Sequence, residues 1–544
     1  MGELNQAGSG RRRIRVAAFL LVAGAGWCAR LASGEAAPAA TPALVTAHVP
    51  NPAADLLPAP VLPLLPADRS PLGAYATQAA TLEQAIDQCV QADMTANRTP
   101  GAAVAVAIDG NLLYQHGYGV KHRRNGGAVD ASTVFRIGSI TKQMTAAAVM
   151  QQVEAGRVNL DDPLTQFVPE LELAGRWPAS AITVRHLLTH TAAYPDNLTS
   201  ISGPTGDDAL SKWVATQTQV RLHAPPGSFW NYSNPNFVLA GLVAERASGI
   251  PYRQYMPAQV WGPAGMTATT LSPADAMAGG NYSFGHYENP YTGAEVIAAP
   301  DSYDNGSVAP AGWAFSTAPD LVRWALLLTD GGGAVLTPAS AEQMEQPQVS
   351  LGYTPGLFYG YGIMVEDYKG LDLRQHGGSL AGWGAMLIWE RERRFAVALL
   401  ANTTTALTRA AYCVVDAVLQ PANVPPPDYH TDPATWRPYA GSYLFTDSFG
   451  TTFRARVELA QRQLFVNFSE LPPPQTTYRT PLVQLYLDTF LLDGNADGEL
   501  DMDVTFIRSG AASAPPRWLR NRNAVGERLG TTRPRLHAAP IPAI

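Results

Sequence analysis

The sequence predicts an α+β domain followed by a small antiparallel β domain. Segments with strand-like apolar patterns occur near both ends of residues 79–424, and helical patterns fill the middle of that region. Strands collected from distant segments, with helices inserted between them, indicate an α+β fold. Three consecutive prolines at 425–427 mark a boundary, and the short alternating segments of residues 429–530 predict the β domain.

The first 35 residues have the order of a secretory signal peptide. Arginines at positions 11–13 and 15 precede an apolar run over 16–28, and small residues follow. This run is shorter than a typical membrane span, so we expect cleavage near Glu35, with an uncleaved membrane anchor as the alternative. Residues 36–78 are rich in Ala and Pro and predict a stiff linker. We therefore expect an exported protein, periplasmic or secreted, that meets a membrane only if the signal is uncleaved.

Composition and charge exclude whole classes of function. With 46% hydrophobic and 15% charged residues in a chain of 544, this is neither a disordered nor a nucleic-acid-coating protein. Its 38 basic and 45 acidic residues give a net charge of −7, so no basic surface for nucleic acid is expected. Cys28 belongs to the signal, which leaves Cys89 and Cys413. These two could form a disulfide in an oxidising compartment or remain buried thiols.

The elements of the α+β region follow from local patterns. Apolar residues recur at helical spacing over 82–94, and an Asp-Gly pair at 109–110 between two β-prone runs predicts a hairpin. A helix is expected from Ser139 to a C-terminal cap at Gly156, and residues 157–340 are expected to be mainly helical with long loops. Further helices and strands are expected at 238–247, 321–328, 385–390, 395–401 and 406–419.

The β domain is expected to consist of short strands without a metal. Strand candidates lie at 440–443, 452–459, 464–468, 482–487 and 504–507. Asp493, Asn495, Asp497 and Gly498 imitate the first half of a calcium loop, but Val504 stands at the twelfth position, where a bidentate glutamate is needed. A polar hairpin turn is therefore the better interpretation.

Ser139 and Lys142 are the first candidates for chemistry. Residues three apart on a helix share a face, so the Ser139 hydroxyl and the Lys142 amine can meet. A serine is a poor nucleophile until a neighbour takes its proton, and a desolvated lysine with a lowered pKa can do so. The helix N-terminus also brings the positive end of the helix dipole near a developing oxyanion. Alone the pair is a weak signal, because an N-cap serine with an exposed lysine has the same pattern.

Tyr232 and Asn234 lie just before another helical pattern. Tyr232 could relay the serine proton, and Asn234 could hold Lys142 or a substrate amide by hydrogen bonds. By itself this Tyr-x-Asn segment indicates no more than a turn before a helix.

A His-Gly-Gly-Ser segment begins at His376, ahead of a strand-like run. Its glycines, Gly378 among them, let a substrate backbone lie against an edge strand. The backbone N–H of Ser379 could complete an oxyanion hole with that of Ser139. The alternative is a glycine-rich loop with a surface histidine.

Together these motifs resemble those of the serine β-lactamase and penicillin-binding-protein superfamily, in its class C β-lactamase-like branch with D-aminopeptidases and esterases. The resemblance covers about residues 80–420, because the segments 100–104, 182–191 and 310–321 also look like stretches of that family. It implies a β-lactamase/transpeptidase-like domain in which helices flank an antiparallel sheet beside a helical subdomain. The C-terminal domain resembles a lipocalin-like β domain, which would shape or cover the cleft.

By this resemblance each candidate has a role. Ser139 is the acylated nucleophile, Lys142 lowers its barrier, and Tyr232 is the acid/base. Asn234 orients these groups. His376 occupies the first position of the family's Lys-Thr-Gly segment, where a lysine usually helps to receive a substrate carboxylate. A largely neutral histidine there is a departure from true β-lactamases and weighs against strong penicillinase activity.

The predicted reaction is acyl transfer without metal or organic cofactor. Ser139 attacks an amide or ester carbonyl, two backbone N–H groups hold the oxyanion, and water releases the acid. The substrate, a small molecule or a peptide, stays open among D-amino-acid peptides, esters and β-lactams. The oligomeric state stays open as well.

Other interpretations of the chain remain open. It could be a non-catalytic protein that binds peptidoglycan or a peptide. Ser379 could instead be the nucleophile of an α/β-hydrolase, although such an elbow needs a helix directly after the serine and a strand-like run follows. His186 and His190 have the spacing of metal ligands, but without a third ligand a helix terminus is the better interpretation. Three aromatic residues could line the cleft or, by default, lie in the core: Trp313, Trp383 and Tyr361.

Overall fold

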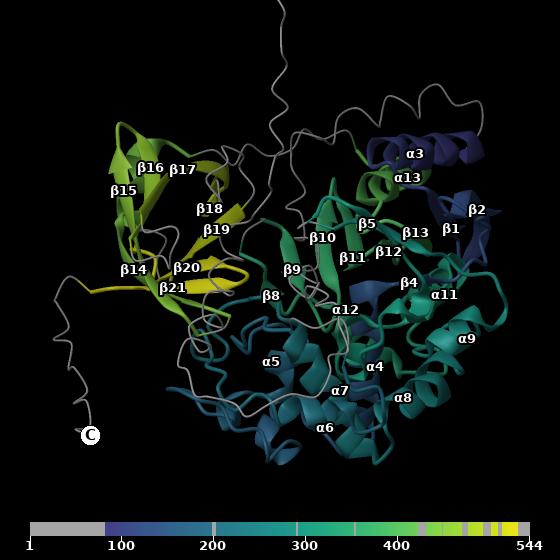
Figure 1. Cartoon of the computed structure of the whole chain (residues 1–544), viewed down its shortest axis with the longest axis horizontal. Coiled ribbons are helices and arrows are strands. Elements are labelled where there is room, and N and C mark those ends of the chain that lie inside the picture. Colours follow the sequence, from purple (N-terminus) through teal and green to yellow (C-terminus); the bar gives the residue numbers. More distant parts are fainter. Residues whose placement is uncertain are drawn as a thin grey trace, which may run out of the picture.

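The computed structural model shows two folded parts, an α+β domain and an antiparallel barrel (Figure 1). The described residues are 82–198, 203–289, 292–352, 355–422, 431–448, 450–469, 477–492, 502–509 and 514–530. The expected signal peptide of residues 1–35, the linker of residues 36–78 and the calcium-like residues 493–498 lie outside them. The predicted fold class, an α+β domain with a small β domain after it, is confirmed.

One nine-stranded antiparallel sheet forms the centre of the α+β domain. Its order is β3-β2-β1-β13-β12-β11-β10-β9-β8, so the first strands of the region pair with the last. Strand β1 (Gly101–Ile108) lies between β2 (Asn111–His122) and β13 (Phe395–Ala401), and Ala102 pairs with Ala401. The other strands are β3 (Gly126–Ala128), β8 (Val349–Ser350), β9 (Leu357–Tyr359), β10 (Met364–Tyr368), β11 (Leu371–Leu380) and β12 (Trp383–Glu390).

The turn between β1 and β2 has the conformation that its sequence predicts. Asp109 and Gly110 both have a positive φ, 53° and 76°, as a two-residue type I′ turn requires. Glycine adopts this region freely and aspartate tolerates it, which is why Asp-Gly favours the turn. The predicted hairpin is therefore confirmed.

Alternate residues of the central strands face two different helical layers. Ala103 packs into the core that includes helix α4 (Thr141–Glu154). Ala102, its neighbour, faces α3 (Leu82–Ala96) and α13 (Thr408–Leu419) on the opposite side. Because both faces of the sheet are covered, these strands are apolar throughout instead of alternating.

Helices α3 and α13 lie side by side and are joined by a disulfide (Figure 1). Cys89 of α3 and Cys413 of α13 form it, with their Cα atoms 5.7 Å apart. The sequence left this pair open between a disulfide and two buried thiols, and the structure decides for the disulfide. The bond connects the two ends of the domain across a sequence separation of 324 residues.

Replacing Cys89 and Cys413 together by serine is expected to lower the free energy of unfolding. For a loop this long the chain-entropy argument gives about 6 kcal/mol, and removal of natural disulfides costs about 2–5 kcal/mol. Guanidinium unfolding followed by circular dichroism measures the shift in midpoint. Wild-type protein kept in reducing agent should match the double variant. A variant with the midpoint of the oxidised wild type would show that the bond contributes nothing.

A helical layer covers the other face of the sheet. Its centre is formed by α4 and by α7 (Asn234–Ser248), which pack against each other. Helix α7 ends where Gly249 adopts a left-handed φ of 73°. Further helices are α5 (Val184–Leu188), α6 (Ala209–Val214), α8 (Tyr252–Tyr255), α9 (Pro273–Ala278), α10 (Ala309–Gly312), α11 (Ala318–Thr329) and α12 (Pro338–Glu345). None of the helices in the described part of the chain has the length and apolarity needed to cross a bilayer.

The His-Gly-Gly-Ser segment lies inside a strand, not ahead of one as expected. Residues 376–379 belong to β11, a central strand of the sheet. The sequence hides this strand because its polar residues break the apolar pattern. Three of them, Arg374, Gln375 and His376, are buried nevertheless, since they find partners inside the protein. Gln375, for example, donates hydrogen bonds to the Glu366 carboxylate and the Tyr412 hydroxyl.

The β domain is a closed eight-stranded antiparallel barrel. Its strands are β14 (Gly441–Asp447), β15 (Thr452–Ala460), β16 (Gln463–Ser469), β17 (Thr477–Tyr486), β18 (Thr489–Leu492), β19 (Met502–Ile507), β20 (Trp518–Asn521) and β21 (Ala524–Arg528). Strands β18, β20 and β21 were not predicted, because each has only four or five residues and little room for a pattern. Aromatic side chains fill much of the interior, namely Tyr443, Phe445, Phe453, Phe468, Phe490 and Phe506.

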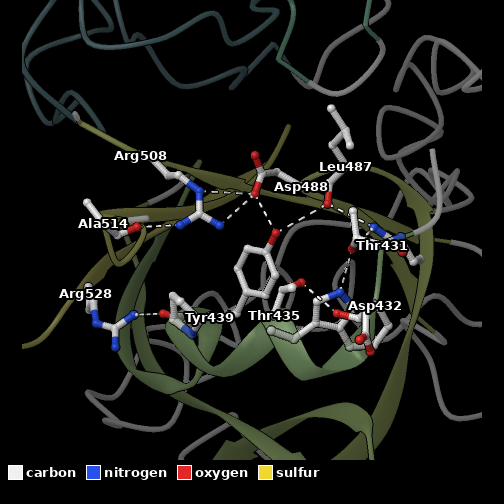
Figure 2. A network of polar contacts seen from close by, with 12 residues as sticks. Thr431, Asp432, Thr435, Tyr439, Leu487, Asp488, Arg508, Ala514 and Arg528 are labelled. Atoms are coloured by element: carbon white, nitrogen blue, oxygen red, sulfur yellow. Dashed lines mark hydrogen bonds and ion pairs between the residues drawn. The ribbon is translucent and has the colours of Figure 1, made fainter. Parts of the chain in front are cut away.

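A 3-10 helix, η9 (Pro433–Tyr439), packs Trp436 and Tyr439 into the barrel core. Figure 2 shows the polar network that anchors it. The Tyr439 hydroxyl donates to Asp488 Oδ1 at 2.7 Å, and Arg508 pairs with the same carboxylate at 3.0 Å. The Arg508 guanidinium also lies 4.9 Å from the centre of the Tyr439 ring. The helix is thereby tied to the turn after β17 and to the end of β19.

Candidate active site

The centre of the site is the turn that carries Ser139 into helix α4. Residues Gly138–Ile140 form one 3-10 turn, and α4 begins directly after it at Thr141. Ser139 and Lys142 therefore share a face, and Lys142 Nζ lies 2.9 Å from Ser139 Oγ. The structure thus brings the two residues of the predicted pair together, and both are buried.

Lys142 is buried among uncharged oxygen acceptors. Its Nζ lies 2.8 Å from Asn234 Oδ1 and also within hydrogen-bonding distance of the Ala311 carbonyl oxygen. Burial disfavours the charged amine and the positive charge of Arg522 acts in the same direction, so the pKa of Lys142 falls well below its usual value. A neutral amine has two protons, and these two fixed acceptors take both. Its lone pair is then left to accept the Ser139 hydroxyl proton.

Tyr232 lies beside the same amine. The centre of its ring is 4.9 Å from Lys142 Nζ, and the residue is buried. Burial raises the pKa of Tyr232 above its usual value, although the charge of Arg522 and a hydrogen bond with Ser139 act to lower it. The lowered pKa of Lys142 thus favours a neutral amine, and the raised pKa of Tyr232 favours a neutral phenol. The amine is the group prepared to accept a proton, and the phenol is the group prepared to donate one.

Backbone hydrogen bonds fix the segment that carries Tyr232 and Asn234. The N–H of Asn234, the first residue of α7, donates to Asp196 Oδ1 at 3.0 Å. The N–H of Ser233 donates to His190 Nδ1 at 3.2 Å. These bonds use backbone N–H groups to fix the segment. The side chains of Tyr232 and Asn234 are therefore left free for chemistry.

The backbone nitrogens of Ser139 and Ser379 are neighbours. A Cβ built on Gly138 would lie 2.6 Å from Ser379 N, and one built on Gly378 would lie 3.2 Å from Ser139 N. Gly138 also has a φ of 53°, which glycine adopts without strain. Strand β10 pairs with β11 only as far as Gln375, so the glycine segment of β11 is not covered by that strand. The two expected oxyanion donors therefore meet where glycines leave space.

The Ser379 side chain is not part of an α/β-hydrolase site. Its hydroxyl donates to the Thr404 carbonyl oxygen at 2.8 Å, and its strand continues to Leu380 before β12 begins at Trp383. A nucleophile elbow needs a helix directly after the serine. The α/β-hydrolase alternative is therefore wrong, and the contribution of Ser379 is its backbone.

His376 is a buried, neutral residue. Its Nδ1 lies 2.6 Å from the Gly377 carbonyl oxygen and must donate to it. Its Nε2 therefore accepts from the Tyr359 hydroxyl at 3.0 Å. Burial, together with the nearby Lys142, lowers the pKa of His376 to about 3. The residue cannot supply the positive charge that a lysine at this position would offer to a carboxylate.

His190 has a larger part in the site than its sequence indicates. It follows helix α5 with a φ of 56°, and its ring centre lies 4.3 Å from that of Tyr232. Burial holds the pKa of His190 well below the usual histidine value. The ring that packs against Tyr232 is therefore the neutral imidazole. His186 instead caps α5 together with Thr183. Within the described residues, no three His, Cys, Asp or Glu side chains lie close enough to hold a metal ion.

Asp196 and Arg522 are site residues that sequence reasoning missed. Arg522 lies in the turn between β20 and β21 of the barrel, and its Nε donates to Asp196 Oδ2 at 2.9 Å. Its guanidinium carbon lies 4.6 Å from the centre of the Tyr232 ring. No local pattern could have found this contact, because 326 positions separate the two residues. The barrel therefore reaches the site with a charged side chain.

The aromatic residues considered for the cleft wall belong to the core. Trp313, Trp383 and Tyr361 are all buried. The rings of Trp313 and Trp383 lie 5.0 and 5.9 Å from the guanidinium carbon of Arg136. Arg136 in turn donates to the Pro300 carbonyl oxygen at 2.6 Å. This cluster fixes the loop that leads to α10, the helix that supplies an acceptor for Lys142.

Known proteins are similar to this chain in sequence and in fold. The family model described as Beta-lactamase matches residues 86–418. Penicillin-binding protein 4 of Amycolatopsis lactamdurans is 29% identical over 362 residues, which cover 64% of this chain and 94% of that protein. Esterase EstB of Burkholderia gladioli is 29% identical over 372 residues, which cover 61% of this chain and 93% of that protein. The solved structure of SurE, 26% identical, has a TM-score of 0.63 over 82% of this chain and 99% of that one, and SurE has also been solved with D-Leu.

Proposed function

The chain belongs to the beta-lactamase family of serine hydrolases, and on that premise we propose that it hydrolyses amide or ester bonds through an acyl-enzyme on Ser139. The observation that carries the proposal is the buried Lys142 amine 2.9 Å from Ser139 Oγ. Two fixed acceptors take both protons of the neutral amine. A base held in this way activates a hydroxyl that would otherwise be a poor nucleophile.

Acylation begins when Ser139 Oγ attacks the substrate carbonyl carbon. The hydroxyl proton passes to Lys142 Nζ as the new C–O bond forms. The backbone N–H groups of Ser139 and Ser379 hold the oxyanion, and one such donor contributes about 3 kcal/mol to the barrier reduction. Tyr232 then protonates the leaving nitrogen or oxygen as its bond to carbon breaks, and the proton held by Lys142 restores the phenol.

Water releases the acid by the same steps in reverse order. Lys142, neutral again, takes a proton from the attacking water through the hydroxyl of Tyr232. The second tetrahedral intermediate collapses with Ser139 Oγ as leaving group, and Oγ recovers its proton from Lys142. Asn234 keeps Lys142 in place throughout, because its Oδ1 accepts from the amine in both protonation states.

Amides, peptides or esters of D-amino acids are the proposed substrates, in preference to β-lactams. Both ring nitrogens of His376 have partners inside the protein and the ring is neutral, so the position offers no cation to the carboxylate of a penicillin. The relative named as an esterase supports ester substrates, and the solved structure of SurE with D-Leu supports the D-amino-acid class.

Covalent labelling with a fluorophosphonate, followed by intact-mass spectrometry, tests the nucleophile. Wild type should gain one adduct, and Ser139→Ala should gain none. Ser379→Ala is the matched control, because it removes only a hydroxyl that bonds to Thr404 and leaves the backbone N–H. Equal labelling of Ser139→Ala would place the nucleophile elsewhere. An unlabelled wild type would favour the non-catalytic peptidoglycan- or peptide-binding protein.

Export is part of the proposal. The charged and apolar order of residues 1–35 motivates it, and the disulfide between Cys89 and Cys413 supports it, because such bonds persist in oxidising compartments. The intact mass of the protein from the producing cell tests the point. A mass that still includes residues 1–35 in a cytosolic fraction would contradict export.

A further inference from the structure

The β20–β21 hairpin of the barrel lies against the segment that carries Tyr232. Figure 1 shows this hairpin, in yellow, on the side of the barrel that faces the α+β domain. Phe229 packs against Trp518 of β20, with ring centres 5.3 Å apart. Ala193, Ala224 and Val525 bury the same contact in one apolar cluster.

Two further residues of the segment are held by hydrogen bonds from the hairpin. The carbonyl oxygen of Trp230 accepts from the Arg520 guanidinium, which also stacks 5.4 Å from the Trp230 ring. Asn231 Nδ2 donates to the carbonyl oxygen of Arg522 at 3.2 Å. Residues 229–231 are therefore each in contact with the hairpin. Tyr232 is the next residue of the same segment.

Arg522 reaches Tyr232 and the start of helix α7. Its guanidinium carbon lies 4.6 Å from the centre of the Tyr232 ring. Its Nε and Nη2 both donate to Asp196 Oδ2. The other oxygen of Asp196 accepts from the N–H of Asn234 at 3.0 Å. A continuous chain of hydrogen bonds thus runs from the barrel through Asp196 to Asn234, and the same guanidinium lies against the ring of Tyr232.

We propose that Arg522 is a positioning residue of the acyl-transfer site, which acts through Asp196 to hold Tyr232 and Asn234 in their reactive geometry. The proposal rests on the proposed function. The Asp196 side chain is only 3% exposed, so water and salt compete weakly for the ion pair. Charge-assisted bonds from two guanidinium nitrogens also restrict the orientation of the pair.

The same ion pair sets the charge around Lys142. The titratable groups that face the amine are His190 and Asp196 after α5, Tyr232 before α7, His376 on β11 and Arg522 from the barrel. Burial keeps the two histidines and the phenol neutral. The charges that act on the amine are therefore the two opposite charges of the ion pair, Arg522 and Asp196. Loss of Arg522 should therefore raise the pKa of Lys142, and loss of the Asp196 charge should lower it.

The rate constant of fluorophosphonate labelling, measured from pH 5 to 9, tests the proposal with the full chain. This probe has no carboxylate, so a slower reaction cannot come from a lost contact to a substrate carboxylate. Arg522→Gln should label about 10- to 100-fold more slowly, because small displacements of reacting groups have effects of that size. The acid limb of the profile, where the labelling rate falls as the pH is lowered, should move to higher pH in Arg522→Gln. In Asp196→Asn the same limb should move to lower pH.

Arg456→Gln is the matched control. Arg456 lies on the barrel surface, 69% exposed and paired with Glu458 at 3.1 Å, so its loss should change neither rate nor pH profile. If Arg522→Gln behaved like this control, the proposal would be overturned. Slower labelling with unmoved acid limbs in both Arg522→Gln and Asp196→Asn would also overturn it, in favour of a contact that only stabilises the fold.

The proposal can still be tested if Arg522→Gln fails to fold. If Arg522→Gln does not fold, Asp196→Asn alone decides, because its acid limb either moves to lower pH, which supports the proposal, or stays in place, which overturns it. A wild type that takes no label would contradict the proposed function and this inference with it. A labelled wild type beside an unaffected Arg522→Gln would contradict this inference alone.

Discussion

Replacing Lys142 by methionine is expected to lower the rate of Ser139 acylation about 1,000-fold. Methionine has a similar length and fills the buried site, but it has no lone pair to accept the hydroxyl proton. A positioned general base contributes about 100- to 10,000-fold to such a step. Single-turnover labelling with the fluorophosphonate measures the loss. Lys212→Met is the matched control, because Lys212 is 59% exposed and pairs with Asp208 on the surface.

The pH dependence of labelling shows whether Lys142 is the base that the substitution removes. The pKa of Lys142 lies well below its usual value, so the wild-type amine is neutral above that lowered pKa and becomes protonated as pH falls through it. Wild-type labelling should therefore decline on the acid side, whereas the residual labelling of Lys142→Met should lack that limb. His376 cannot imitate it, because its pKa of about 3 lies below the range of the assay. An unchanged acid limb in the variant would assign the base to another residue.

The same substitution has a consequence for stability. In the unfolded chain the pKa of Lys142 returns to about 10.5, and in the folded protein it lies well below. Between these two values the unfolded state binds more protons, so this residue makes wild-type stability rise with pH across the window. The methionine variant lacks the effect. Unfolding midpoints at pH 7 and pH 9.5 should therefore differ more in wild type than in Lys142→Met.

The core of the site could be predicted from the sequence because its geometry is local. Ser139 and Lys142 are one helical turn apart, so a helix alone brings their side chains together. Tyr232 and Asn234 lie at the start of a helix, whose first residue is fixed by backbone bonds. The central strands β1 and β13 were predicted for a similar reason, since burial on both faces leaves a continuous apolar run.

The missed features depend on contacts between distant segments. Strand β11 was hidden because its buried polar residues are satisfied by partners far along the chain, as Gln375 is by Tyr412. The disulfide stayed open because the distance between α3 and α13 is set by the whole sheet. The bond from Arg522 to Asp196 crosses from the barrel to the α+β domain. Local sequence patterns contain no information on such distances. A resemblance to a family assigns roles only to residues that lie inside the family's motifs.

Of two adjacent glycines of β11, Gly378 is expected to be sensitive to substitution by alanine and Gly377 is expected to tolerate it. A Cβ on Gly378 would lie 1.9 Å from the Ile137 carbonyl oxygen and 3.2 Å from Ser139 N. Because the first contact is with backbone, the turn that carries Ser139 must move away from β11. This separates the two oxyanion donors, and loss of one such donor costs about 100- to 1,000-fold in rate. Gly378→Ala should therefore label at least about 100-fold more slowly than wild type.

Gly377→Ala is the control that isolates this cause. A Cβ on Gly377 meets nothing closer than Met386 Sδ at 3.7 Å, which is ordinary van der Waals contact. Both variants add one methyl group to the same strand, so a general loss of strand flexibility would slow them equally. Only the distance to the Ser139 turn differs. Near wild-type labelling of Gly377→Ala beside slow labelling of Gly378→Ala would assign the loss to the oxyanion hole, whereas equal rates in the two variants would remove that role from the Ser139–Ser379 pair.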